Sequence, residues 1–143
     1  MLIGLNPVLG PELLHALRAM GHGDTIVLAD ANFPAASVAR RLIRADGADL
    51  PSLLTAVLSV LPIDEMEPEP AVGMEVVGDP ARREPVHRDM ERLLSRHGQP
   101  STSLALIERH AFYERARSAF AVVASGERRF YGNIILRKGV VAS

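Results

Sequence analysis

The sequence predicts a single α/β domain over residues 1–143, with three α/β/α layers around a mixed central sheet. Short apolar runs rich in β-branched residues alternate with segments whose apolar residues recur at helical spacing. Near the C-terminus, two strand-like runs follow each other with no helix between them, which predicts an antiparallel strand in the sheet. A chain of 143 residues is long enough to bury one core and has the size of one domain.

The first two elements are expected to be a helix and a buried strand. Proline suits the first helical turn, so the helix is predicted to begin at Pro11 and to stop at the glycines from Gly21 on. Its inward face is predicted to carry Leu13, Leu14, Leu17 and Met20. The run TIVLAD, 25–30, is apolar and β-branched like a buried strand. Pro34 closes this segment because it restricts the residue before it to an extended conformation.

A second strand and helix are expected next. The strand covers Arg41 to Arg44 and is closed by a turn at 45–47. The helix has Asp49 near its N-cap and ends at Pro62. Its inward residues are predicted to be Leu50, Leu53, Leu54, Val57 and Leu58. The acidic, proline-rich segment 64–70 is interpreted as a solvated loop.

The second half is predicted to continue the alternation and to end in a β-hairpin. A strand over 73–79 precedes a polar-faced helix that begins at Pro85 and has Gly98 as its C-cap. A strand over 103–108 and a helix over 109–119 follow. The last two strands, 120–125 and 133–140, are expected to be joined by a turn near Ser125 to Arg128.

Composition argues against several classes of protein. The 16 Lys and Arg balance 17 Asp and Glu, whereas a nucleic-acid binder needs a basic surplus. The absence of cysteine excludes disulfides, a thiolate nucleophile and cysteine-bound zinc. The first residues form a poor signal peptide, and no apolar run approaches the ~20 residues of a membrane span. A cytoplasmic protein without nucleic-acid or membrane partners is therefore expected.

Polar residues stand where several predicted strands end. Ligands of open α/β sheets sit beyond the carboxyl ends of the parallel strands, where Asp30 and Arg109 are expected. Tyr131 and Asn133 alternate at the start of the last strand and would share one face at the same edge. His22 precedes its strand and is expected at the opposite edge. It must then reach the site another way, or a neighbouring subunit must complete the site.

Each of these residues also has a purely structural interpretation. Asp24 is expected to cap a turn or orient His22, and Asn32 to form a turn. Arg109 is equally consistent with a surface ion pair with Glu108 or Glu114, while Phe112 and Tyr113 are expected to pack. Three histidines on predicted helices, His15, His87 and His97, are expected to be surface residues. No pair has the i, i+4 spacing of a helical metal site.

Five stretches carry a resemblance to a known family. They are MGHGD (20–24), LADANFPA (28–35), IRADG (43–47), FYERA (112–116) and YGNIILRKGV (131–140). In this order they resemble the ribose pyranase and fucose mutarotase family, whose fold is RbsD-like, and its fucose branch in particular. The ribose branch tends to have His where Arg109 stands and YAN where this chain has Tyr131-Gly132-Asn133. Members of the family assemble as rings of subunits, often decamers, so the resemblance implies a homo-oligomer with sites near subunit boundaries.

The resemblance also implies roles for individual residues. His22 resembles the proton-transferring residue, and the residues that resemble the sugar contacts are Asp30, Arg109, Tyr131, Gly132 and Asn133. Exchanging sugar anomers requires proton transfers that open and close the ring, and histidine, with an ordinary pKa of ~6.5, suits them near neutral pH. Tyr131 is either a second proton-transfer group or a hydroxyl partner. The reaction needs no cofactor or metal, and none is expected.

The expected function is interconversion of the α and β anomers of L-fucose by general acid–base catalysis. Pyranose–furanose interconversion of D-ribose uses the same ring opening and is the nearest alternative. A non-catalytic monosaccharide-binding or sensing protein, and a structural ring subunit without a ligand, are the alternatives from other classes.

Overall fold

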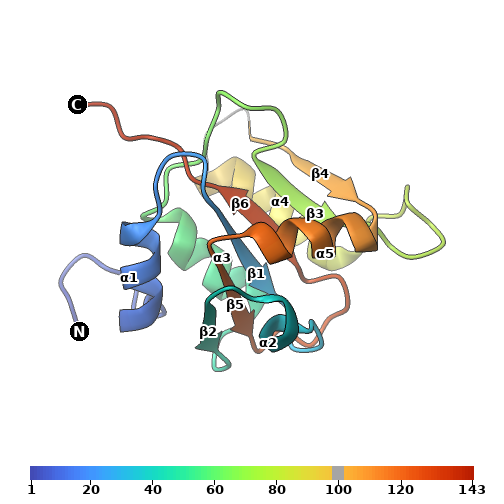
Figure 1. Cartoon of the computed structure of the whole chain (residues 1–143), viewed down its shortest axis with the longest axis horizontal. Coiled ribbons are helices and arrows are strands. Elements are labelled where there is room, and N and C mark those ends of the chain that lie inside the picture. The colour runs from blue at the N-terminus through green and yellow to red at the C-terminus, as the bar shows by residue number, and fades with distance from the viewer. Residues whose placement is uncertain (98–101) are drawn as a thin grey trace.

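The computed structural model describes residues 1–97 and 102–143, and a six-stranded mixed sheet forms its centre (Figure 1). The strands lie in the order β2-β5-β1-β6-β3-β4. Their bounds are β1 Thr25–Ala29, β2 Leu42–Ala45, β3 Ala71–Met74, β4 Leu104–Ile107, β5 Ala121–Ser125 and β6 Ile134–Arg137. The helices are α1 Pro11–Ala19, α2 Ala35–Val38, α3 Leu50–Leu58, α4 Pro85–His97 and α5 Arg109–Ser118. The predicted α/β class with a mixed sheet is confirmed.

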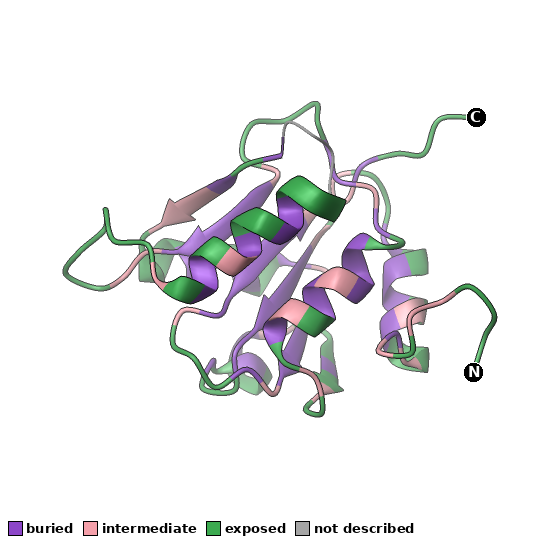
Figure 2. Cartoon of the chain, turned by 180° about the vertical axis from the view of Figure 1, so that it is seen from behind, coloured by how far each residue is buried: buried purple, intermediate pink, exposed green. Residues whose placement is uncertain are grey.

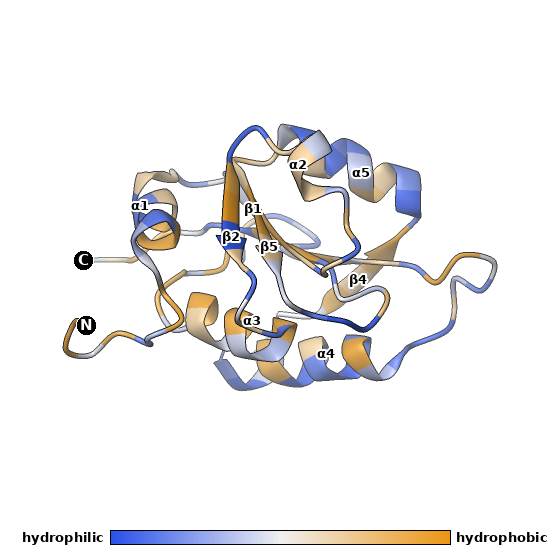
Figure 3. Cartoon of the chain, turned by 90° about the horizontal axis from the view of Figure 1, so that it is seen from below, coloured by the Kyte–Doolittle hydropathy of each residue, from blue (hydrophilic) through white to orange (hydrophobic). Residues whose placement is uncertain are grey.

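Helices cover both faces of the sheet, as three layers require (Figure 3). Helices α2 and α5 lie together on one face, and α3 and α4 lie together on the other. The apolar side of α1 joins the buried cluster that includes α3 and α4. The central strands β1 and β5 are consequently buried along almost their whole length (Figure 2). This explains why both are continuous apolar runs rather than alternating ones.

The helix predictions rest on spacing and capping, and the structure confirms both. Helix α1 begins at Pro11 and buries Leu13 and Leu17, although Leu14 stays partly exposed. Asp49 caps α3 through its carboxylate, which accepts a 2.9 Å hydrogen bond from Ser52 N–H. The five residues predicted to face inward from α3 are all buried: Leu50, Leu53, Leu54, Val57 and Leu58. The predicted C-cap Gly98 lies outside the described residues.

Strand β3 and helix α2 differ from the prediction. Strand β3 begins at Ala71 and ends at Met74, so the polar end of the predicted 73–79 strand is outside the sheet. A short helix that was not predicted, α2, follows Pro34 and buries Ala35 and Val38. It has a single turn, too short for helical spacing to reveal.

The predicted hairpin between the last two strands is wrong. Strand β6 pairs antiparallel with β1 and β3, and β1 lies between β5 and β6. The direction of β6 was predicted correctly, but the connecting segment 126–133 crosses the end of β1 instead of making a tight turn. Ala31 N–H donates to the Glu127 carbonyl at 2.8 Å and fixes this crossing. Two equally apolar strands carry no local signal that says which neighbours they will have.

Among the described residues, no helix is long and apolar enough to cross a membrane. The same part of the chain holds no group of three or more His, Asp or Glu side chains placed to bind a metal ion.

Candidate functional site

A cavity of about 310 Å³ opens at the edge of the sheet where β1 and β3 end and β6 begins. Its volume is at the lower end of the ~300–1,000 Å³ typical of small-ligand pockets. It is lined by Asp30, Asn32, Phe33, Met74, Val77, Arg109, Tyr113, Phe130, Tyr131 and Asn133. Residues from distant parts of the chain meet here because β5 is parallel to β1 and β6 is antiparallel to it. The structure therefore brings together four of the residues that the sequence singled out.

Asp30 and Asn133 form the floor of this pocket. Asn133 Nδ2 donates to Asp30 Oδ2 at 3.0 Å, and Asp30 N–H donates to Asn133 Oδ1 at 2.8 Å. Asn32 N–H donates to the other carboxylate oxygen of Asp30 at 2.9 Å. Burial raises the pKa of the Asp30 carboxyl, although these hydrogen bonds oppose the rise. Each carboxylate oxygen keeps acceptor capacity for a ligand hydroxyl.

Tyr131 adopts a conformation that the sequence did not predict. It precedes β6, which begins at Ile134, and its φ of 65° lies in the left-handed region. Tyr131 and Asn133 thus do not alternate on a strand, contrary to the prediction, although both line the pocket. Val77 N–H donates to the Tyr131 hydroxyl oxygen at 3.1 Å. This bond occupies an acceptor position and leaves the hydroxyl proton able to point toward a ligand.

His87 lies behind Tyr131 and is not a surface residue, which corrects the prediction for this histidine. The side chain is fully buried, with 6.2 Å between the centres of its ring and that of Tyr131. Its Nδ1 accepts from Glu84 N–H at 3.0 Å, and its Nε2 lies 2.9 Å from the Met74 carbonyl. Burial lowers the pKa of the ring, so the neutral form with its proton on Nε2 satisfies both contacts. His15 and His97 are exposed, as predicted.

Helix α5 supplies the cationic side of the pocket. The Glu108 carboxylate caps the helix by accepting from His110 N–H and Ala111 N–H, and Arg109 is the first helical residue. No ion pair joins Arg109 to Glu108 or Glu114 among the residues that the structure describes. Arg109 instead lines the pocket, and a guanidinium presents its donors in a planar fork. Tyr113, one turn later, also lines the cavity and packs edge-on against Phe33 at 5.5 Å.

Gly132 holds Tyr131 and Asn133 close to the end of β1. A Cβ atom on this residue would lie 2.7 Å from Glu127 Cγ and 3.4 Å from Asp30 Cβ. The position therefore requires glycine because of a close approach, not because of its φ angle.

His22 lies at the other end of β1, as the sequence predicted. Its ring is 46% exposed, and Nε2 lies 3.4 Å from Asp64 Oδ2. Asp24 closes the turn around it by accepting from Gly21 N–H at 2.8 Å, which matches its expected capping role. A strand of this length separates His22 from Asp30 by about 15 Å at ~3.3 Å per residue. Within one subunit, His22 is not part of the pocket.

Asp64 is a partner of His22 that the sequence did not reveal. The sequence predicts that it begins a solvated acidic loop, but its side chain is 3% exposed. Its pKa is lowered by the Met66 N–H that it accepts at 3.0 Å and, to a smaller extent, by His22. The rest of the segment, Glu65 to Glu69, is exposed as expected.

A larger cavity of about 520 Å³ lies at the His22 edge of the sheet. Its charged lining consists of Asp24, Glu67, Glu69, Arg115 and Arg137. Arg115 already pairs with Glu69 at 3.5 Å, and Arg137 Nη1 donates to the Gly23 carbonyl. Because three carboxylates face two guanidinium groups, this cavity selects no particular ligand charge. The smaller pocket is therefore the better candidate for a ligand site, because its polar groups converge on one space.

Sequence reasoning missed two apolar residues at the rim of the smaller pocket. Phe130 is 72% exposed and Val77 is 59% exposed, although both are large apolar side chains. Phe130 directly precedes the predicted sugar-binding run, which was the available signal. Exposed apolar side chains beside a polar pocket are typical of a contact surface.

Comparison with known proteins agrees with this geometry. The RbsD / FucU transport protein family matches residues 3–141. A human fucose mutarotase is 53% identical over 97% of this chain and 94% of its own length, and a bovine one is 51% identical over 99% and 95%. A structure of a Streptococcus pneumoniae fucose mutarotase in complex with L-fucose matches with a TM-score of 0.91 and 41% identity, covering 99% of this chain and 100% of that one.

A more distant structure shares the fold alone. Bacillus subtilis RbsD complexed with D-ribose superposes with a TM-score of 0.78 at 21% identity, over 99% of this chain and 100% of its own. Likeness at this identity confirms the predicted RbsD-like architecture without bearing on the ligand. With the family match over nearly the whole length and relatives about half identical, the chain belongs to the RbsD / FucU family.

Proposed function

We propose that this protein is an L-fucose mutarotase, an isomerase that interconverts the α and β anomers of the free sugar. One observation carries the proposal. Asp30, Arg109, Tyr131 and Asn133 converge in one pocket, in a chain about half identical to fucose mutarotases over its whole length. The pocket is small, rich in hydrogen-bonding groups and walled by aromatic rings, as suits a monosaccharide.

The chemistry requires two proton transfers in each direction. Ring opening delivers a proton to the ring oxygen while the anomeric hydroxyl loses one, which breaks the C1–O5 bond and forms the aldehyde. Rotation about the C1–C2 bond presents the other face of the aldehyde, and closure reverses both transfers. A positioned acid or base contributes about 10²–10⁴-fold to such steps.

The pocket residues suit binding, and two groups suit proton transfer. Asp30 accepts hydrogen bonds from sugar hydroxyls, and Arg109 donates to sugar oxygens. The free hydroxyl proton of Tyr131 serves either as a donor to the sugar or as the second transferable proton. His22 is proposed as the main proton-transfer residue, with Tyr131 as the other group that suits this role.

His22 reaches a pocket only in an oligomer under this proposal. It lies about one strand length from the pocket of its own subunit, so we infer that a neighbouring subunit supplies it. The exposed Phe130 and Val77 at the pocket rim give such a neighbour an apolar contact. A closed ring, with the decamer as the expected size, repeats this heterologous contact at every boundary. The cytoplasmic location stays a prediction.

Proton NMR exchange spectroscopy tests the function directly. The rate of exchange between the α and β anomeric signals of L-fucose is measured with and without catalytic amounts of protein, with D-ribose in parallel. The proposal predicts faster fucose exchange. Acceleration of ribose pyranose–furanose exchange alone would move the assignment to the ribose activity. Binding of fucose without faster exchange would indicate a sensor, and no binding a structural subunit.

A further inference from the structure

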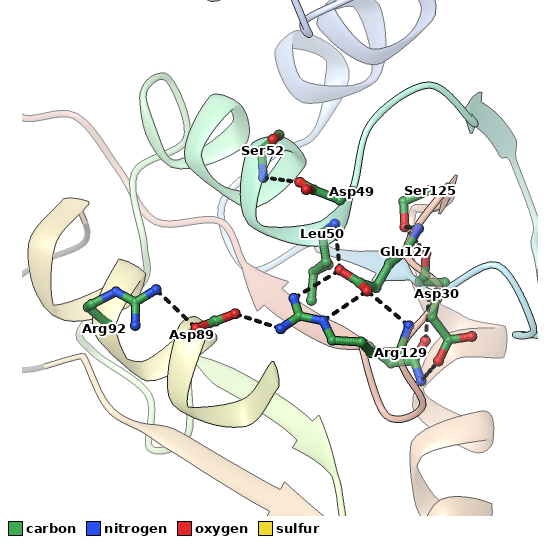
Figure 4. A network of polar contacts seen from close by, with 11 residues as sticks. Asp30, Asp49, Leu50, Ser52, Asp89, Arg92, Ser125, Glu127 and Arg129 are labelled. Atoms are coloured by element: carbon green, nitrogen blue, oxygen red, sulfur yellow. Dashed lines mark hydrogen bonds and ion pairs between the residues drawn. The ribbon is translucent and has the colours of Figure 1, made fainter. Parts of the chain in front are cut away.

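The segment between β5 and Tyr131 contains a buried carboxylate that the proposed chemistry does not use. The Glu127 side chain is 5% exposed and accepts four hydrogen bonds (Figure 4). Three come from Arg129: its backbone N–H at 2.9 Å, Nε at 3.0 Å and Nη2 at 3.1 Å. The fourth comes from Leu50 N–H at 3.2 Å, in the first turn of α3. The carboxylate is therefore fully paired and faces away from solvent.

Arg129 extends this network to a second helix. Its Nη1 donates to Asp89 Oδ2 on α4 at 2.7 Å, and the other oxygen of Asp89 accepts from Arg92 Nη2 at 3.0 Å. Figure 4 shows the guanidinium of Arg129 lying between the two carboxylates. The segment is thus attached at once to the N-terminus of α3 and to α4. Charge-assisted, bidentate contacts of this kind fix geometry better than neutral ones.

The same segment is also attached to β1 and to the loop before α3. Ser125 Oγ donates to the Ala29 carbonyl at 2.6 Å, and the Glu127 carbonyl accepts from Ala31 N–H at 2.8 Å. Gly126 N–H donates to the Ala48 carbonyl at 2.7 Å. A Cβ atom on Gly126 would collide with backbone atoms of Asp46, so the segment is closely packed against its neighbours at this point.

The network reaches the pocket through Gly132. Gly132 packs closely between Glu127 and Asp30. A Cβ atom on Gly132 would have Glu127 Cγ as its nearest neighbour and would also contact Asp30. Tyr131, immediately before it, has a left-handed φ that non-glycine residues disfavour. A residue in such a conformation needs surroundings that hold it there. Glu127 and Arg129 form the ion pair that precedes it in the chain.

We propose that Glu127 and Arg129 are positioning residues of the active site, which hold Tyr131, Gly132 and Asn133 in the geometry that binds the sugar. The expected change in KM rests on the proposed function, whereas the expected change in the position of Tyr131 rests on the structure alone. Neither residue lines the pocket. Loss of the Glu127 charge is expected to let the Tyr131 segment relax out of the binding geometry.

A spectroscopic test needs no substrate. The chain has two tyrosines and no tryptophan, so incorporation of fluorotyrosine yields two fluorine NMR signals, assigned with Tyr113→Phe. Glu127→Gln keeps the shape of the side chain and removes its charge. We expect it to shift or broaden the Tyr131 signal and to leave Tyr113 unchanged. Two unchanged signals in a folded Glu127→Gln protein would overturn the proposal.

The kinetic test compares Glu127→Gln with Glu114→Gln, a matched change at an exposed ion pair with Arg117 on α5. At equal amounts of folded protein, we expect Glu127→Gln to lower kcat/KM for fucose about tenfold, mostly through KM, because misplaced binding groups weaken sugar contacts. Glu114→Gln is expected to match the wild type. A Glu127→Gln protein that is less stable but has unchanged KM and kcat would show that Glu127 has only a structural role, which would contradict the proposal.

A gentler variant covers the case in which Glu127→Gln fails to fold. Asp89→Asn removes the charge from the outer partner of Arg129, which weakens that contact, and leaves the Glu127–Arg129 pair intact. It is expected to move the Tyr131 signal and KM in the same direction by a smaller amount, and no movement of either would contradict the proposal. A wild-type protein that does not accelerate fucose exchange would refute the proposed function alone, because the fluorine signals still report the geometry.

Discussion

The two ends of strand β1 differ in how their functional side chains are held. At the carboxyl end, Asp30 and Asn133 are 5% and 3% exposed and bond to each other twice. At the amino end, the His22 ring is 46% exposed and has a 3.4 Å contact with Asp64. The carboxyl end of β1 lies in a hydrogen-bonded pocket, whereas the amino end presents His22, the proposed proton-transfer residue, on a glycine-flanked turn.

Under the proposed function, one subunit holds two halves of a site that do not meet within it. The pocket end is organised by the fold itself, so its residues are expected to affect both stability and binding. The His22 end takes no part in the core, so His22 is expected to affect the rate alone. Substitutions at the two ends therefore separate folding from catalysis.

His22→Ala is expected to have the largest effect on rate. Removing the proton-transfer group should lower kcat for fucose mutarotation by about 10²-fold or more, because a positioned acid or base contributes about that much. The midpoint of thermal unfolding should change little, since the ring is half exposed. Anomer exchange and thermal denaturation measure the two quantities, with the exposed His15→Ala as the matched control. A near-normal rate would remove His22 from proton transfer.

Asn133→Ala is expected to lower both the stability of the protein and its affinity for fucose. It leaves the buried Asp30 N–H without its partner and removes one of the donors to the Asp30 carboxylate, which costs about 2–4 kcal/mol of unfolding free energy. Fucose binding should weaken in parallel. Urea denaturation and sugar titration check this, and Asn6→Ala, which loses a local bond to Val8 N–H, is the control. Unchanged stability would show that the pocket floor is not part of the core.

The loss of stability at acid pH is expected to depend on the Glu127 carboxylate. Its hydrogen bonds with Arg129 lower the pKa of this carboxyl from 4.5 to about 2. A lowered pKa in the folded state adds stability that is complete above about pH 4.5 and is lost as the pH falls toward 2. The difference amounts to about 2–3 kcal/mol, since the side chain is buried. Denaturation of wild type and Glu127→Gln between pH 6 and 2 should show the gap closing with acid, and a constant gap would contradict this reasoning.

Arg109→His is expected to have the smallest effect on the fold and a modest one on selectivity. Arg109 is exposed at the start of α5, so the change should leave unfolding unaltered. The ribose branch of the family tends to have histidine here, and a shorter, weaker donor should favour ribose over fucose by a few-fold. Parallel exchange measurements on both sugars test this. Equal responses of both would show that Arg109 does not select the sugar.

Much of the fold was predictable because local patterns specify it. Continuous apolar runs predicted the strands, and proline, aspartate and glycine marked helix ends such as those at Pro11 and Asp49. The pocket edge followed from the rule that ligands lie beyond strand ends. That rule placed Asp30 and Arg109 together, and the reversed direction of β6 added Asn133.

What failed depends on contacts that are distant in sequence. The pairing of β6 with β1 and β3 has no local signal, so a hairpin was predicted instead. His87 stands among polar residues and was predicted to be exposed, but hydrogen bonds to two backbone groups allow its burial. The segment with Glu127 and Arg129 looked like an ordinary polar turn. Its role becomes visible only when α3 and α4 are placed beside it.

Co-assembly of two inactive variants tests the shared site most directly. His22→Ala subunits keep an intact pocket, and Arg109→Ala subunits keep an intact His22. If neighbouring subunits complete each site, mixed oligomers from equal amounts of both should recover about a quarter of the wild-type fucose exchange rate, by random pairing across boundaries. Each variant alone should stay inactive. Mixed oligomers, verified by two affinity tags, that recover no activity would contradict the account.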